Sequence, residues 1–364
     1  SRGDFDPALT LDASRKTFDG KNYYFYTNPE LKIPTWIGLN VKAGLENNGG
    51  NYLNPEVTKG QSSYLGVEMP LAKGLVMDKR RAALQQAKIM INQSEQDRLN
   101  AMNDLLFEAY AAYWQWAGTY SLYSLYTKYL QASAERYRLV KIAYENGDRA
   151  AMDTLEALTQ VQSFMMLQSD AKMKLNDAAI DLSNYLWQDN DSAYDLPSTF
   201  VPDTLQFAME QQAPQLDQLI RTASDQNPAL KSYSYKLDAL AVERKLKFQS
   251  LLPVVNAKAN LLNKGYNVFK GVDGAFLENN YKWGIDVKVP LFLREGRGDY
   301  KQAKLKIEET NYALSAKRWE VENKIRSYYN QFIQMQAQLK IMLSMFANYT
   351  SLLRQEDFKF QNGE

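Results

Sequence analysis

The residue types that most enzymes use for proton transfer, nucleophilic attack and zinc binding are missing from this sequence. It contains no histidine and no cysteine, which removes imidazole bases, thiolate nucleophiles and the commonest zinc ligands. We therefore predict no catalytic, cofactor-binding or metal-binding residue, and we expect that the protein is not an enzyme. Only charged and aromatic side chains remain as candidates for a functional site.

Two carboxylates one helical turn apart are the first candidates. Asp153 and Glu156 follow the turn Asn146-Gly147-Asp148, at the start of a stretch with helical periodicity. If several copies of this pair surrounded a narrow opening, their negative charge would attract cations. Alternatively, Asp153 only stabilises the helix start through the helix dipole. Gly147 is expected to end the preceding helix in a conformation with φ > 0.

The overall charge and hydropathy exclude two classes of protein. The 43 lysines and arginines nearly balance the 42 aspartates and glutamates, so the basic excess needed to bind nucleic-acid phosphates is absent. No apolar run approaches the roughly 20 residues of a membrane-spanning helix. If this protein enters a membrane, we expect that it does so through strands.

Long segments without proline predict helices of unusual length. They cover about 75–143, 151–187 and 297–360, and a shorter helical segment covers about 214–250 with a break at Asn227-Pro228. In the first segment, apolar residues recur with alternating steps of four and three from Met102 to Tyr123, which is a coiled-coil spacing. The many tyrosines and tryptophans of this segment are expected to pack between helices rather than to stack on a ligand.

Shorter segments alternate apolar and polar residues with a period of two, which predicts strands. They lie at about 8–16, 36–45, 65–69, 255–261 and 283–289. The pattern is typical of a barrel strand between lipid and water, but also of any half-solvated antiparallel sheet. Period alone leaves both interpretations open.

The sequence also contains an internal repeat. The strand Leu65–Met69 ends in Pro70-Leu71, and the strand Trp283–Val289 ends in Pro290-Leu291, each just before a long helix. The segments 143–148 and 359–364 then place an aromatic-x-x-Gly turn at the far end of each helix. The repeat unit is strands, a descending helix, a turn and a returning helix. The second copy stops at its turn, and the first copy has no counterpart of the helix predicted at 214–250, so we expect that the sequence lacks a helix at each end.

This ordered and duplicated set of motifs resembles the TolC family of outer-membrane efflux proteins over essentially the whole chain. Further motifs that carry the resemblance are Asn227-Pro228-Ala229-Leu230, Leu252-Pro253 and the hairpin from Tyr144 to Asp153. The segment Gly3–Pro7 is similar to the form found in Bacteroidetes-type members. The resemblance implies a mainly α protein with membrane β-structure, in which each two-repeat subunit contributes strands to a shared trimeric β-barrel and helices to a coiled-coil tunnel.

The family's architecture implies a division of the chain into six parts. These are first-repeat barrel strands and an extracellular loop (1–74), a long helical hairpin of the periplasmic tunnel with its tip at 144–153 (75–187), an equatorial loop (188–213), an ascending tunnel helix (214–252), second-repeat barrel strands (253–293) and a second descending helix (294–364). One departure is that the family has two strands per repeat, whereas periodicity predicts three before Pro70. Either the segment 8–16 or 36–45 is not a full strand, or the stretch Tyr23–Pro34 hides a reversal. We favour an elaborated first hairpin, with 47–60 in an extracellular loop.

The resemblance also implies partners and roles. The protein would be a homotrimeric channel of the outer membrane and periplasm, in contact with outer-membrane lipid, and would passively conduct substrates from an inner-membrane pump and a periplasmic adaptor (membrane fusion protein) in tripartite efflux or type I secretion. Asp153 and Glu156 would lie at the periplasmic aperture, and Tyr144, Gly147, Asp148 and Arg149 would contact the adaptor. A soluble coiled-coil scaffold or adhesin with a β-rich head is the alternative; in that case the apolar strand faces would pack together as a sandwich.

Overall fold

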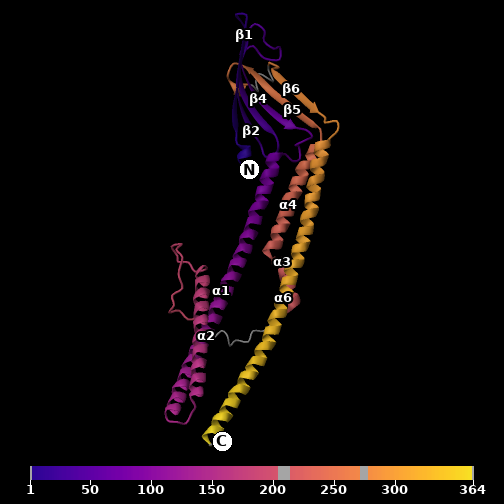
Figure 1. Ribbon diagram of the computed structural model, residues 1–364. Coiled ribbons are helices and arrows are strands. Elements are labelled where there is room, and N and C mark those ends of the chain that lie inside the picture. Colours follow the sequence, from indigo (N-terminus) through magenta and orange to yellow (C-terminus); the bar gives the residue numbers. More distant parts are fainter. Residues whose placement is uncertain (1, 204–213, 271–277, 363–364) are drawn as a thin grey trace. The chain divides into compact units, whose positions relative to one another are not determined.

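The computed structural model describes residues 2–203, 214–270 and 278–362 (Figure 1). The chain divides into two compact units, Ser1–Asp97 with Leu216–Glu364, and Arg98–Gln215. The helix α1 (Lys79–Glu145) begins in the first unit and ends in the second. Among the described helices, none combines the length and the apolar character that crossing a lipid bilayer requires.

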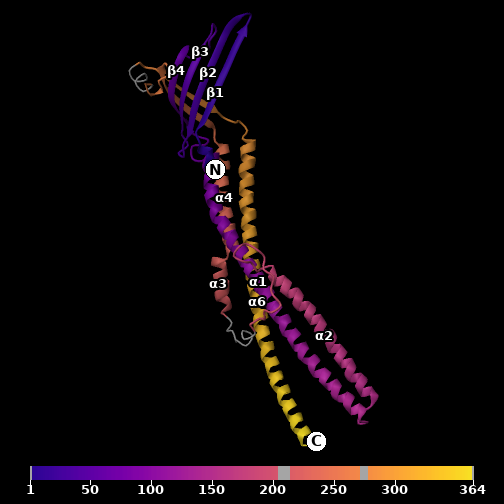
Figure 2. The same cartoon turned by 90° about the vertical axis from the view of Figure 1, so that its left-hand side faces the viewer.

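The first unit contains one antiparallel sheet whose strands follow the order of the chain. The strands are β1 (Ala8–Phe18), β2 (Lys21–Pro34), β3 (Asn40–Gly49), β4 (Gly60–Pro70), β5 (Val254–Lys264) and β6 (Tyr281–Lys288). Figure 2 shows β1 to β4 lying side by side. The first repeat joins the second directly, because β4 pairs with β5 from Ser62 and Lys264 to Pro70 and Asn256.

Four strands, not three, precede the first long helix. The hidden reversal lies in β2, which turns back from β1 through Asp19-Gly20, where φ is +51° and +71°. Two successive residues with positive φ form the tight turn that matches the twist of a hairpin. The even strand number removes the conflict over chain direction. The predicted segments 8–16 and 36–45 correspond to β1 and β3, although β3 begins only at Asn40. Part of the expected loop 47–60 belongs to β3 and β4.

Among the described residues, three further α-helices belong to the first unit. They are α3 (Leu216–Gln226), α4 (Pro228–Phe248) and α6 (Arg294–Gln361). At about 1.5 Å per residue, the 68 residues of α6 extend for about 100 Å. The side chain of Asn227 accepts hydrogen bonds from the backbone N–H groups of Ala229 and Leu230 at 3.0 and 3.3 Å, which explains why a new helix starts at Pro228.

The α4 helix packs along α6 next to the sheet. Lys247 Nζ of α4 donates to Asp299 Oδ2 of α6 at 2.8 Å, and this hydrogen bond raises the pKa of Lys247. Gly296 allows the start of α6 to approach closely, since a Cβ there would lie 2.6 Å from the carbonyl oxygen of Ser250. A small apolar core of Met77, Ala82 and Val242 joins the start of α1 to α4.

The second unit is a helical hairpin formed by the later part of α1 and α2 (Ala151–Ser183), which are labelled in Figure 1. Its core contains Trp116, Ala178 and Leu182. Ring stacking of Tyr129 on Phe164, with centroids 5.5 Å apart, adds a second contact between the two helices. Trp116 therefore packs between helices as predicted, while Tyr110 and Trp114 remain exposed in the single chain.

Candidate functional site

The strand register places apolar residues from all six strands on one face of the sheet. One row across the sheet joins residues that are directly paired: Leu9, Leu31, Ala43, Leu65, Leu261 and Tyr281. The next row joins Ile33, Val41, Val67, Ala259 and Trp283. The apolar face, as we call it, is made of these two rows with Leu11, Met69, Ile285 and Val287.

The apolar face is turned to the surroundings of the chain. Leu9 is 76% exposed, Trp283 is 68% exposed and even the central Val67 is 41% exposed. A soluble sheet would instead cover such a face with another layer. Among the described residues, only one sheet is formed, so there is no second sheet to complete a sandwich. The sandwich expected for a soluble scaffold is therefore not found.

The opposite face is polar and closely packed. It carries Glu30, Lys32, Lys42, Glu68 and Tyr64, and Tyr64 is only 9% exposed. Lys42 Nζ lies 2.6 Å from Glu68 Oε2 and 3.7 Å from Glu30 Oε1, while Lys32 Nζ lies 3.4 Å from Glu68 Oε2. The hydroxyl of Tyr64 donates to Glu30 Oε2 at 2.5 Å. We call this set the polar-face network.

Neighbouring strands extend the polar-face network. Lys258 on β5 pairs with Asp286 on β6 at 2.7 Å, and Ser62 donates to Glu46 at 2.9 Å. For Lys42 and Glu68, whose side chains are 17% and 18% exposed, the ion pair offsets the loss of water around the two charges. Around the network on β2, β3 and β4, the sheet is thus polar on its more covered side and apolar on its more open side, which is the arrangement of a barrel wall with lipid outside and water inside. Sequence periodicity predicted the two faces but not the ion pairs that link the strands.

Gly147 closes the far end of the helical hairpin. Its φ is +86°, its N–H donates to Tyr144 O at 2.9 Å, and the N–H of Asp148 donates to Ala143 O at 2.8 Å. These two bonds make the glycine-terminated C-cap known as the Schellman motif, which agrees with the positive φ expected at Gly147. All residues from 144 to 152 are exposed, so the predicted contact residues Tyr144, Gly147, Asp148 and Arg149 are accessible in the chain.

The two candidate carboxylates lie on α2 but do not contact each other. Asp153 Oδ2 lies 3.6 Å from Arg149 Nη1, and Glu156 Oε1 lies 3.9 Å from Arg136 Nη2. Asp153 is in the first turn of α2, where its charge favours the helix dipole, and its N–H donates to Ala150 O at 3.1 Å. Sequence reasoning did not foresee either arginine partner, although the spacing from Arg149 to Asp153 is that of an i, i+4 ion pair.

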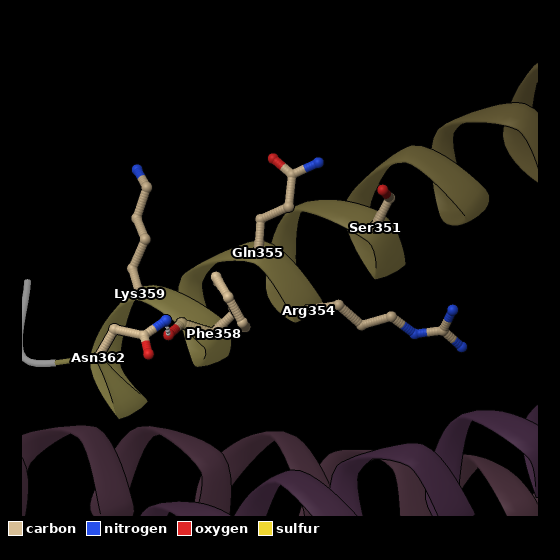
Figure 3. A pocket seen from close by; sticks show the side chains of 6 residues that line it. All are labelled: Ser351, Arg354, Gln355, Phe358, Lys359 and Asn362. Carbon is tan, nitrogen blue, oxygen red and sulfur yellow. Dashed lines mark hydrogen bonds between the residues drawn. The ribbon is translucent and has the colours of Figure 1, made fainter.

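Figure 3 shows a shallow surface on the last turns of α6, lined by Ser351, Arg354, Gln355, Phe358, Lys359 and Asn362. All six side chains come from a single helix, and Asn362 Nδ2 donates to the carbonyl of Phe358 at 2.9 Å. No base or nucleophile converges there. The described residues also contain no group of three or more acidic side chains that could hold a metal ion. The second predicted turn, at Gly363-Glu364, lies outside the described residues.

Comparison with known proteins agrees with this geometry. Residues 37–186 match the model of the outer membrane efflux protein family. The resemblance to the TolC family is confirmed. With it, the predicted combination of long helices with antiparallel strands and the location in the bacterial outer membrane are confirmed as well. No curated protein is similar enough in sequence to count as a relative.

Three solved structures illustrate the shared fold. The Campylobacter jejuni CmeC outer membrane channel has a TM-score of 0.58 and 15% identity, covering 90% of this chain and 63% of that one. The open-state MtrE outer membrane channel of Neisseria gonorrhoeae has a TM-score of 0.55 and 15% identity, with 90% and 65% covered. A membrane protein from Pseudomonas aeruginosa has a TM-score of 0.55 and 16% identity, covering 90% of this chain and 66% of that one. The chain thus spans about two thirds of the length of these TolC-like structures.

Proposed function

We propose that three copies of this chain form an exit duct through the outer membrane, which passively conducts substrates delivered by an inner-membrane pump and a periplasmic adaptor. In this proposal the sheet lies in the outer membrane with its apolar face toward lipid and its polar-face network toward the lumen. The helices extend into the periplasm as parts of a shared tunnel. Tripartite efflux and type I secretion both require such a duct.

The observation that carries the proposal is the two-faced sheet with two unpaired edges. The β1 and β6 strands each have one neighbour within the described sheet, so each presents a free edge. Unpaired backbone groups are not tolerated in lipid, where no water can satisfy them. Other copies of the chain are the simplest cover, since the duct must close on itself. The family resemblance supports three.

The hairpin tip is the proposed docking end. Tyr144, Gly147, Asp148 and Arg149 would contact the adaptor, because they are exposed and held in a fixed turn by two backbone hydrogen bonds. Asp153 and Glu156 would line the aperture. Both carboxylates are paired with arginines in the single chain, so their effect on ions depends on whether those arginines keep these contacts in the assembly.

Conductance of the full-length protein in planar bilayers tests the proposal. We expect stable channels, and we expect that Asp153→Asn with Glu156→Gln shifts the reversal potential in a salt gradient toward lower cation selectivity. Glu135→Gln is the matched control, because Glu135 is an exposed carboxylate that Arg138 Nη2 already contacts at 2.6 Å. A monodisperse, detergent-free monomer without channel activity would overturn the proposal.

A further inference from the structure

The β1–β2 hairpin is bonded into the sheet on both sides of Pro29. The β2 strand pairs with β3 from Phe25 and Gly49 to Thr27 and Asn47, and again from Glu30 and Gly44 to Pro34 and Asn40. The polar-face network also crosses this boundary, because Glu30 and Lys32 of β2 contact Lys42 of β3 and Glu68 of β4. On the other side of the sheet, Leu9 and Leu31 continue the apolar face without a gap.

This pairing determines which strand can meet another copy. The outer edge of β3 is occupied by β2, so a neighbouring chain cannot pair there unless the hairpin detaches. Within the described part of the chain, the strands with only one neighbour are β1 and β6. Since the six strands alternate in direction, β6 of one copy runs antiparallel to β1 of the next.

The two free edges are staggered along the strand direction. The row that contains Leu9, the second residue of β1, reaches β6 at Tyr281, its first residue. From this row, β1 extends toward Phe18 on one side while β6 extends toward Lys288 on the other. Without a shift between copies the two edges would hardly overlap. Such a stagger is what a tilted barrel requires.

The pleat and the charges restrict the shift. It must be an even number of residues, because an odd shift would exchange the two faces. Shifts of six and of eight both place all of β6 opposite β1. A shift of eight puts Asp12 opposite Asp286 and Lys16 opposite Lys282, and like charges directly opposite are destabilising.

A shift of six avoids these clashes. Leu11 then lies opposite Ile285, and Asp12 lies opposite Gly284. The diagonal neighbours of Asp12 are Lys282 and Asp286, and Asp286 is already paired with Lys258 at 2.7 Å. The apolar face continues across the joint through Leu11 and Ile285.

We propose that β1 of one copy pairs antiparallel with β6 of the next, with Leu11 opposite Ile285, so that the β1–β2 hairpin is part of the barrel wall. The inference rests on the proposed function. Three copies of the six-stranded sheet give 18 strands. With strands ~4.8 Å apart, ~3.3 Å per residue and a shift of six per copy, the strands tilt by about 35°. The backbone radius is then roughly 17 Å, against roughly 11 Å for a barrel with four strands from each copy.

Disulfide trapping in the full-length protein tests this joint. The 364 residues contain no cysteine, so introduced thiols have no competitor among them. Leu11 and Ile285 are 66% and 53% exposed, so Leu11→Cys and Ile285→Cys should leave the fold intact. We expect that oxidation of the double variant in outer membranes shifts the denatured, non-reduced band from one chain mass to three. Either single variant should stay at one.

Two further pairs test the alternatives. Ala13→Cys with Ile285→Cys reports the shift of eight, and a covalent trimer from this pair alone would overturn the register. Leu45→Cys with Ile285→Cys reports a barrel in which β3 is the edge, and its cross-linking would overturn the inclusion of the hairpin. If conductance of the reduced samples persists while the Leu11 pair does not cross-link, only this inference fails. If conductance and trimers are both absent, the proposed function fails too.

Discussion

Replacing Gly147 tests whether the hairpin tip is held by backbone geometry. Gly147 adopts φ of +86°, and the C-cap at this position uses the N–H groups of Gly147 and Asp148. A Cβ at this position would meet no other atom within 4 Å. The effect of Gly147→Ala therefore comes from the left-handed backbone conformation and not from a steric clash with a neighbouring element.

The size of the effect of Gly147→Ala therefore follows from the cost of the left-handed backbone conformation alone. For an L-residue with a Cβ, the left-handed conformation costs about 1 to 2 kcal/mol relative to glycine. Asparagine tolerates this conformation better than alanine, so Gly147→Asn should lose less. Because about 1.4 kcal/mol corresponds to a factor of ten, Gly147→Ala should raise the local opening equilibrium roughly 5- to 30-fold.

Amide hydrogen exchange measures that opening directly. We expect that the backbone N–H groups of residues 147 and 148 exchange roughly 5- to 30-fold faster in Gly147→Ala than in wild type. In Gly147→Asn the increase in the exchange rate should be smaller. Gly118→Ala is the matched control, because Gly118 lies inside α1 with open space around it; there alanine should stabilise the helix by about 1 kcal/mol. Equal exchange at the tip in wild type and Gly147→Ala would refute the assignment of the cap.

Three further substitutions probe the first unit. Gly296→Ala should lower the free energy of unfolding by about 1 to 3 kcal/mol, because its Cβ would lie 2.6 Å from the carbonyl oxygen of Ser250. The loss should appear as a lower melting temperature of the detergent-solubilised protein. Lys247→Met should lose only about 0.2 to 1 kcal/mol, since its ion pair with Asp299 is partly exposed. The pKa of Lys247 is raised in the folded state, so the stability that the ion pair contributes is complete below the ordinary lysine pKa. The difference in unfolding free energy between wild type and variant should vanish as pH rises through the folded-state pKa. Unfolding at neutral and at strongly alkaline pH measures it. Val67→Arg should cost about 2 to 4 kcal/mol if the apolar face meets lipid, and unchanged yields of folded protein in outer membranes would argue against that environment.

The sequence predicted five of the strands because their apolar residues alternate clearly, and it missed β2 as an assigned strand for a physical reason. Tyrosines occupy both faces of β2, and Pro29 interrupts its ladder, so the period of two is obscured. A usable signal was present in Asp19-Gly20, since this dipeptide favours the tight turn of a hairpin. Turn chemistry would have found the strand that hydropathy could not.

The candidate site was predictable only where local chain geometry determines it. The positive φ of Gly147 follows from a glycine that ends a long helix, and Asp153 falls in the first turn of the next one. By contrast, the contact of Glu156 with Arg136 joins two helices across the hairpin, so it depends on how they pack. Whether these residues act at an aperture or on an adaptor depends on contacts between chains, which the sequence of one chain does not encode locally.

Alternation along a strand says that two faces differ, but not which of them is covered. A soluble sheet and a barrel wall in lipid have the same period, and exchanging their faces leaves the pattern unchanged. Exposure separates the two cases: here Tyr64, on the polar face of β4, is 9% exposed, whereas Val67, on the apolar face of the same strand, is 41% exposed. The polar side is covered because its lysines and glutamates bind one another across β2, β3 and β4. Breaking that network would therefore leave unpaired charges on the covered face. The apolar face would not be affected, because none of the network's side chains lies on it.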